Sequence, residues 1–173
     1  EWVPIRPGTD AALVFSMINV LLNELEIYDR AFIKRYTNGP YLVRPDGYYM
    51  RQDGKPLVWD AEEGKAKPYD AEVRDFAIEG SFSIDGIECR PAFQLLKEHV
   101  RKYTPEMAEE ITSVPAATIR RLSAEFGREA RIGSTIMVDG VEFPYRPAAA
   151  NVYRGAGSHK HGVGAALGVI TLN

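Results

Sequence analysis

Apolar residues recur at helical spacing in several parts of the chain, beginning near its start. Between Ala11 and Glu26 they recur every three or four positions and form a wide apolar face. A face of this width predicts a helix that is covered on most of its sides. Asp29 can cap a short second helix that runs through Tyr36. Further helices are predicted over residues 91–103, 104–112, 115–130 and 159–171.

Between Tyr41 and Cys89 the pattern changes to short apolar runs separated by turn residues. Asp46-Gly47, Asp53-Gly54 and Asp85-Gly86 are pairs that favour tight turns between antiparallel strands. The segment from Asp60 to Asp75 is charged and poor in apolar residues, and a loop is expected there. The sequence therefore predicts a β-rich insertion over residues 41–89, with strands at 41–44, 48–51, 56–59, 82–84 and 87–89.

The two ends of the chain repeat one arrangement, in which a strand, a turn and a helix follow one another. Near the start, Val3–Ile5 is expected to end a buried strand, and Thr9 is expected to cap the helix that follows the turn. Near the end, strands predicted at Ser134–Val138 and Ala149–Tyr153 precede a glycine-rich turn at Arg154–Ser158. The predicted fold class is α/β: a single partial domain over residues 1–173, with a partial nucleotide-binding (Rossmann-like) sheet, flanking helices and the β-hairpin insertion.

These two turns carry different chemistry. Free backbone N–H groups at a helix start bind phosphate, and glycines let a ligand approach the backbone closely. Asp10 would repel phosphate, but its carboxylate can accept two hydrogen bonds from the edge of a guanine ring. Together the turns predict a nucleotide-containing ligand. On these residues alone a purely capping role is favoured, because short glycine turns before helices are common.

Composition narrows the range of functions. Apolar residues make up 45% of the chain and charged residues 26%, which is typical of a folded globular domain. The net charge of −3 argues against a general binder of nucleic acid or anionic membranes. Cys89 is the single cysteine, so the chain alone can form neither a disulfide nor a cysteine-based zinc or iron–sulfur site. The longest apolar stretch, Ala11–Leu22, is too short to span a membrane.

The chain begins without an initiator methionine or a basic leader segment, and we expect it to be a fragment of a longer protein. Three stretches carry a resemblance to known proteins. They are Trp2–Leu13 with Glu24–Ile33 and Tyr36-Thr37, then Tyr103–Glu106 with Glu109–Ala116 and Ile119–Leu122, and the glycine-rich end through Leu172-Asn173. Together they resemble the molybdopterin oxidoreductase family, of the DMSO reductase, formate dehydrogenase and nitrate reductase types. The last stretch is similar to the segment before the family's LTGN motif.

The resemblance implies an enzyme that binds two pterin–guanine dinucleotides around one molybdenum or tungsten atom. The first turn would lie against the guanosine end of one dinucleotide, with Asp10 as the guanine acceptor. The second turn would approach the other dinucleotide or its phosphates. The run Ser158–Gly162 departs from the family's Gln-His-x-Asn-Gly, which leaves the register after Gly157 open. The residues assigned to the cofactor in this way are Pro7, Gly8, Thr9, Asp10, Gly155, Gly157, His159 and Lys160.

The resemblance also implies parts that have no counterpart in this sequence. The 4Fe-4S cluster and the ligand of the metal are expected elsewhere in the parent chain, so this segment is expected to be inactive alone and to hold no cofactor when isolated. The expected partners are the rest of the parent catalytic chain and an iron–sulfur electron-transfer subunit, without nucleic acid or direct membrane insertion. The substrate, the choice of metal and the cellular compartment do not follow from these residues.

Three alternatives are weighed against this interpretation. Residues 107–126 also fit a helix-turn-helix DNA-binding regulator, with Arg120 and Arg121 on the recognition helix, although nearby glutamates oppose DNA binding. His159 and His161 could belong to a metal site, but no carboxylate lies next to them in the sequence. A stand-alone structural or partner-binding module descended from the enzyme is the third alternative.

Overall fold

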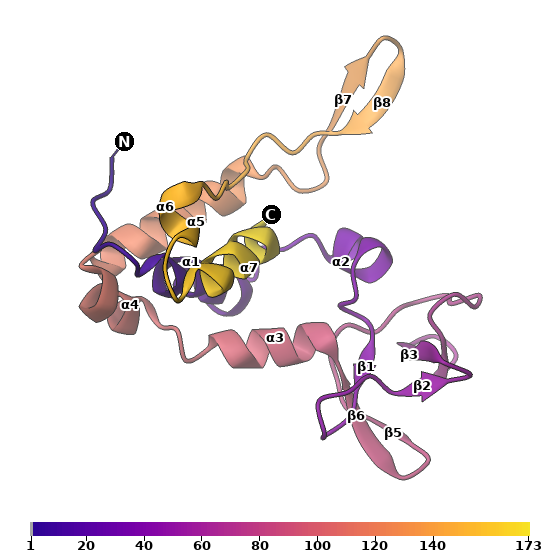
Figure 1. Cartoon of the computed structure of the whole chain (residues 1–173). Coiled ribbons are helices and arrows are strands. Elements are labelled where there is room, and N and C mark those ends of the chain that lie inside the picture. The colour runs from indigo at the N-terminus through magenta and orange to yellow at the C-terminus, as the bar shows by residue number, and fades with distance from the viewer. Residues whose placement is uncertain (1) are drawn as a thin grey trace. The chain divides into compact units, whose positions relative to one another are not determined.

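Helix α1 (Asp10–Asn19) continues without a break into the π-helix η1 (Val20–Glu24) in the computed structural model, which describes residues 2–173 (Figure 1). This confirms the helix predicted from Ala11 to Glu26, which ends two residues early. Val14 and Ile18 of α1 are buried, as are Val20, Leu21 and Leu22 of η1. The wide apolar face is therefore covered, as its pattern predicts.

The chain divides into two compact units, which are described separately. The first unit comprises Glu1–Tyr28 and Val100–Asn173, of which Glu1 lies outside the described residues. The second unit comprises Asp29–His99 and contains the predicted insertion over residues 41–89.

Helices dominate the first unit. Helix α1 packs against α4 (Pro105–Thr112), α5 (Ala116–Glu129) and α7 (Gly162–Leu172), while α6 (Arg154–Gly157) forms a single turn before α7. The start of α4 follows the predicted signal: the Thr104 hydroxyl accepts a hydrogen bond of 3.2 Å from the Met107 N–H, and Pro105 is the first helical residue. The core between α4 and α5 consists of Ala108, Val114 and Ile119, packed against Val3, Ile5, Leu13 and Met17.

Small residues bring α7 against α1. Ala165 and Gly168 are buried on α7, and a Cβ added to Gly168 would overlap Cγ1 of Val14. A Cβ added to Gly164, one turn earlier, would lie 3.8 Å from the Ala11 Cβ, which is an ordinary contact. The opposite face of α7 is apolar and exposed at Val163, Leu167 and Ile170. The helix predicted to begin at His159 therefore begins at Gly162, after the single turn of α6.

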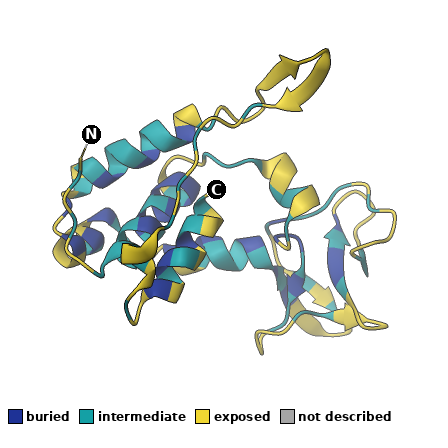
Figure 2. Cartoon of the chain, turned by 45° about the horizontal axis from the view of Figure 1, so that its top comes forward, coloured by how far each residue is buried: buried dark blue, intermediate teal, exposed yellow. Residues whose placement is uncertain are grey.

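A two-stranded hairpin projects from the helices of the first unit (Figures 1 and 2). Its strands are β7 (Thr135–Val138) and β8 (Val141–Pro144), and the second of them was not predicted. Asp139 and Gly140 both adopt positive φ angles, of 51° and 80°, as a tight hairpin turn requires. Every residue of both strands is exposed.

The second unit is β-rich, and its strands lie between Leu42 and Pro91 (Figure 1). Two antiparallel sheets have the strand orders β1-β6-β5 and β2-β3-β4. Cys89 is buried in the core with Leu42 and Leu57, and Trp59 stacks on Phe82 with 4.5 Å between ring centroids. The elements of this unit are α2 (Arg30–Tyr36), β1 (Leu42–Val43), β2 (Arg51–Gln52), β3 (Lys55–Asp60), β4 (Lys65–Pro68), β5 (Phe82–Ile84), β6 (Ile87–Pro91) and α3 (Ala92–Val100).

The loop predicted from Asp60 to Asp75 is partly wrong. Residues 65–68 form β4, which pairs with β3 from Leu57↔Pro68 to Asp60↔Lys65. The charges that favoured a loop are paired within the hairpin. The Lys67 ammonium lies 2.8 Å from carboxylate oxygens of both Asp60 and Glu63. Charge alone therefore does not exclude a strand when each charge finds a partner.

The mixed α/β class is confirmed, but the strands expected before the two turns do not form. Val3–Ile5 and Ala149–Tyr153 are irregular, and every strand pair among residues 2–173 is antiparallel. Val3 and Ile5 still pack against the core of the first unit, and the Arg6 N–H donates to the Thr112 carbonyl at 2.9 Å. Their apolar character reflects burial without strand pairing. Across residues 2–173, every helix is too short or too polar to traverse a lipid bilayer.

Candidate functional site

The first turn is shaped by Gly8 and tied to the end of α4. Gly8 has a φ of +78°, a conformation that favours glycine. The Arg6 guanidinium donates a hydrogen bond of 3.0 Å to the Ser113 hydroxyl. Thr9 is the N-cap residue of α1, as predicted, but its side chain makes no cap hydrogen bond, because its hydroxyl donates to the Arg6 carbonyl at 2.6 Å. Asp10 lies in the first turn of α1, as predicted.

The second turn comprises the single helical turn of α6 and the four residues that lead from it to α7. The Ser158 hydroxyl donates to the Arg154 carbonyl at 2.5 Å, and the Gly162 N–H donates to the His159 carbonyl at 2.9 Å. A Cβ on Gly162 would overlap the Gly157 carbonyl, so the loop closes on itself only with glycine there. Gly155 and Gly157 are exposed, with open space where a Cβ would stand. A ligand could therefore approach their backbone closely.

The two turns meet although about 150 residues separate them in the sequence. A Cβ on Gly8 would lie 3.8 Å from Cγ and Nδ1 of the His159 ring. Nε2 of the same ring lies 3.7 Å from Oδ2 of Asp10, the only ion-pair contact of this carboxylate within residues 2–173. The Asp10 side chain keeps 36% of its surface exposed and that of His159 keeps 20%. The structure thus brings Gly8, Asp10 and His159 together at one edge of the first unit.

The remaining predicted site residues surround this contact. Pro7 and Lys160 are exposed, and Thr9 is half-buried beside Asp10 in the chain. The His159 ring accepts a hydrogen bond of 3.1 Å from the His161 N–H at Nδ1, while its buried Nε2 has no hydrogen-bond partner among residues 2–173. The Asp10 carboxylate is thus a half-exposed acceptor, Nε2 of His159 is a buried donor, and Gly155 and Gly157 expose their backbone. Groups of these kinds can bind the polar end of a nucleotide.

Among residues 2–173 no three His, Cys, Asp or Glu side chains are grouped so that they could hold a metal ion. The rings of His159 and His161, the pair considered for a metal site, lie 6.2 Å apart between centroids. Burial raises the pKa of the Cys89 thiol, which lies in the core of the second unit. A thiol kept protonated in this way is a poor metal ligand.

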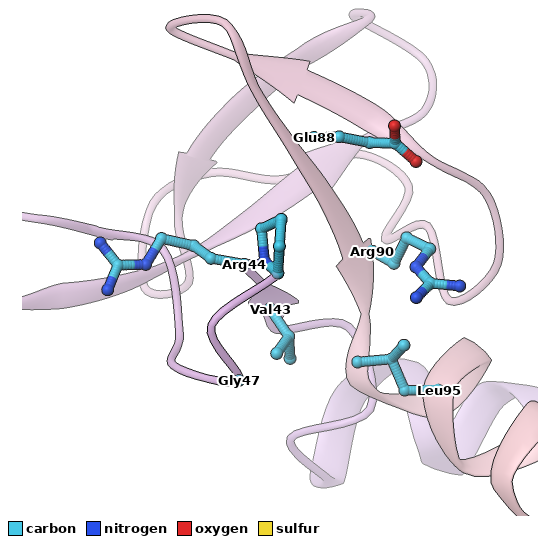
Figure 3. A pocket seen from close by; sticks show the side chains of 7 residues that line it. Val43, Arg44, Gly47, Glu88, Arg90 and Leu95 are labelled. Carbon is cyan, nitrogen blue, oxygen red and sulfur yellow. The ribbon is translucent and has the colours of Figure 1, made fainter.

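The second unit contains a cavity of about 330 Å³ that sequence analysis did not predict. Its lining includes two arginines, but each has its own carboxylate partner: Arg44 contacts Asp46 at 2.6 Å, and Arg90 contacts Glu98 at 2.7 Å. Figure 3 shows the two guanidinium groups pointing away from each other. Because their charges do not converge, the cavity has no feature that would select an anion. The lining residues are Val43, Arg44, Pro45, Gly47, Glu88, Arg90 and Leu95.

Helices α4 and α5 and the turn between them have the outline of a helix-turn-helix, with Ser113 in the left-handed region at φ 66°. One of the two arginines expected on the recognition helix is engaged within the first unit. Arg120 donates to Glu24 at 2.9 Å and to Glu106 at 2.7 Å. These hydrogen bonds raise the pKa of Arg120 further above its usual range. A guanidinium held by two carboxylates is poorly placed to bind phosphate or a base edge.

Replacing Arg120 with alanine should lower the thermal midpoint of the first unit by only about 3 °C, because these ion pairs are largely exposed. Circular dichroism during heating measures the change. Arg128→Ala is the matched control, since among residues 2–173 Arg128 pairs only with the neighbouring Glu129, at 3.0 Å. A drop of 10 °C or more for Arg120→Ala would contradict this assignment of a modest surface network.

The chain is similar to part of several dehydrogenase and reductase subunits. The chain is 38% identical to a sulfite dehydrogenase subunit of Allochromatium vinosum over 148 residues, which cover 76% of this chain and 15% of that protein. It is 32% identical to the alpha subunit of the dimethylsulfide dehydrogenase of Rhodovulum sulfidophilum, covering 73% of this chain and 16% of that protein. A selenate reductase subunit of Mesobacillus selenatarsenatis is 29% identical over 202 residues, which cover all of this chain and 18% of that protein.

The chain thus spans less than a fifth of the length of these relatives. No family model matches the sequence. The relatives are catalytic subunits of molybdopterin oxidoreductases, and the similarity extends over about three quarters of the chain. The chain belongs to the molybdopterin oxidoreductase family.

Proposed function

We propose that this chain is the segment of a molybdenum or tungsten bis(pterin guanine dinucleotide) oxidoreductase that binds the guanosine and phosphate part of the cofactor. The segment is not catalytic alone. Family membership supports the redox enzyme as the parent, and the convergence of the two turns supports the cofactor role. That convergence is the single observation on which the proposal depends.

The two turns bind different parts of the ligand. The Asp10 carboxylate accepts hydrogen bonds from the guanine edge, while the turn of Pro7, Gly8 and Thr9 lies beside the guanosine. The exposed backbone at Gly155 and Gly157, together with the exposed ammonium of Lys160, contacts the phosphates. His159 lies between these two parts, 3.7 Å from Asp10. When bound, the metal and pterin supply the two-electron chemistry, and this segment binds and orients the nucleotide end.

The proposed domain organisation is one cofactor-binding domain over residues 1–173, interrupted by the insertion at 41–89. The first unit supports it, because Glu1–Tyr28 and Val100–Asn173 form one compact body although the second unit separates them in the sequence. An insertion between elements that pack together leaves the core of the parent domain intact.

The rest of the parent catalytic chain is the proposed partner of the exposed apolar face of α7. Val163, Leu167 and Ile170 expose between 56% and 76% of their surface. A row of large apolar residues on one helix face marks a contact surface. Relatives five to six times longer than this chain provide a polypeptide able to cover it. An iron–sulfur electron-transfer subunit is the further partner we propose for the whole enzyme.

Replacing Asp10 with asparagine should weaken binding of guanosine monophosphate (GMP) by about tenfold, because the carboxylate is replaced by an amide that has one acceptor oxygen. Isothermal titration calorimetry of the 173-residue chain with GMP measures the affinity. Millimolar GMP is used because a segment that retains no cofactor when isolated is expected to bind the nucleotide only weakly. Asp139→Asn is the matched control, since Asp139 is an exposed aspartate in the β7–β8 turn of the same unit. Equal affinity for both variants, or no binding by the unaltered chain, would overturn the proposed function.

A further inference from the structure

The two nitrogens of the His159 ring have different surroundings. Nδ1 accepts a hydrogen bond of 3.1 Å from the backbone N–H of His161. In the neutral ring, an acceptor at Nδ1 leaves the proton on Nε2. The backbone of the second turn therefore fixes which side of the ring donates.

The donating side of the ring faces Asp10. Nε2 is buried, has no hydrogen-bond partner among residues 2–173 and lies 3.7 Å from Oδ2 of Asp10. A buried donor without an acceptor is unfavourable. A shift that shortens the distance between Nε2 and Oδ2 by less than about 1 Å would turn this contact into a hydrogen bond. We propose that His159 is a positioning residue that holds the Asp10 carboxylate so that it accepts from two adjacent N–H donors of the ligand.

The pair of Asp10 and His159 determines which nucleobase the site prefers. A carboxylate held at Oδ2 keeps Oδ1 and one lone pair of Oδ2 free, directed away from the imidazole. Guanine offers two adjacent donors, N1–H and the 2-amino group, and can engage both oxygens. Hypoxanthine has N1–H but no 2-amino group, and adenine has a single donor next to an acceptor. The inference rests on the proposed function, and it adds that guanine selection depends on His159 as well as on Asp10.

The test compares GMP with inosine monophosphate (IMP), which differs only by the 2-amino group. The unaltered chain should prefer GMP by about tenfold, the contribution of one hydrogen bond to a charged acceptor. His159→Leu should reduce this preference to about threefold or less, because an unheld carboxylate rotates away from the two-donor arrangement. His159→Gln retains an N–H donor at similar reach and should restore the preference. His161→Ala keeps the backbone N–H that sets the ring and should behave like the unaltered chain.

A spectroscopic signature separates positioning from a general structural role. Long-range ¹H–¹⁵N correlation spectra of the neutral ring should show the His159 proton at Nε2 and none at Nδ1. A ring protonated at Nδ1 overturns the inference directly. If His159→Leu does not fold, as judged by circular dichroism, His159→Asn takes its place, because its amide is too short to reach Asp10.

The outcomes distinguish this inference from the function it extends. Failure of the unaltered chain to bind GMP overturns both. Binding of GMP with an unchanged preference over IMP in His159→Leu or His159→Asn leaves the proposed function standing and rejects the role of His159. Loss of the preference in the His161→Ala control would also reject it, since the side chain of His161 does not contact Asp10 in the proposed arrangement.

Discussion

Asp60→Ala should lower the thermal midpoint of the second unit by about 15 °C or more, which is the largest effect expected of any single substitution in this chain. Asp60 is fully buried at the end of β3. Its carboxylate accepts a hydrogen bond of 2.8 Å from the Lys67 ammonium. Removing the carboxylate leaves Lys67, whose side chain is 12% exposed, without its buried partner.

The same carboxylate also organises the backbone around it. It accepts from the N–H groups of Glu62 and Glu63, which close the turn after β3, and from those of Arg74 and Asp75, which follow β4. These four distances lie between 3.0 and 3.3 Å. Four backbone N–H groups would lose their buried acceptor together, and each such loss is unfavourable. Asp60 is therefore the centre of the segment rather than one member of a surface ion pair.

Acid should weaken this unit through the same residue. The hydrogen bond from Lys67 holds the pKa of Asp60 well below its usual value of 3.8, and backbone N–H groups reinforce it against the opposing effect of burial. A carboxyl group with a lowered folded pKa contributes stability that is fully present above its unfolded pKa. That stability is lost as the pH falls below about 4, toward the folded pKa. The Asp60→Ala variant should therefore show a flatter dependence of stability on pH in this range.

Fluorescence of Trp59 during heating and acid titration measures both effects in a Trp2→Phe background, which removes the other tryptophan. Trp59 stacks on Phe82 in the core of the second unit and reports its unfolding. Glu62→Ala is the matched control, because Glu62 lies in the same turn but is 57% exposed and pairs with Arg74 at the surface. Midpoints within 3 °C of each other for the two variants would contradict the central role of Asp60.

Elements whose signals are local were predicted from the sequence. The Thr104-Pro105 start of α4, the cap of α2 by Asp29 and the hairpin turns at Asp53-Gly54 and Asp85-Gly86 are all present. In each case two or three neighbouring residues determine the backbone geometry. Strand β4 was not predicted, because lysines are typical of solvent-exposed segments. The sequence alone does not show that Lys67 pairs with Asp60 and Glu63.

The site shows the same limit at longer range. The chemistry of Asp10 and of the glycine-rich turn could be predicted, because each depends on residues within one turn. The contact between the two turns could not be predicted, because it requires α1 and α7, about 150 residues apart in the sequence, to pack together. Thr9 is the N-cap residue of α1, as predicted, but its hydroxyl donates to the Arg6 carbonyl of the preceding turn and makes no cap hydrogen bond with the helix. A cap motif specifies a helix start, but the turn before it decides where the hydroxyl points.

Gly168→Ala should destabilise the first unit by about 1–3 kcal/mol, because the added methyl group overlaps Cγ1 of Val14. Val14 is buried, and a β-branched side chain in a helix has one strongly preferred rotamer, so it cannot move aside easily. Alanine favours helix over glycine by up to about 1 kcal/mol, which offsets only part of this strain. Helices α1 and α7 must then separate.

Gly164→Ala provides the control that separates packing from helix propensity. It lies one turn earlier on the same face of α7, and its added Cβ would stand 3.8 Å from the Ala11 Cβ. This variant gains the same helix propensity without the overlap and should be as stable as the unaltered chain or slightly more so. Thermal unfolding of both variants, followed by circular dichroism, measures the difference. Equal midpoints would contradict the close packing of α1 on α7.

The same pair of variants connects packing to the proposed ligand site. Asp10 begins α1, and His159 lies three residues before α7, so the spacing of the two helices sets the 3.7 Å between their side chains. Separation of the helices by the Gly168→Ala overlap should therefore weaken GMP binding even at temperatures where the variant remains folded. Gly164→Ala should bind GMP as the unaltered chain does. Full GMP affinity in a destabilised Gly168→Ala chain would show that the ligand needs only one of the two turns.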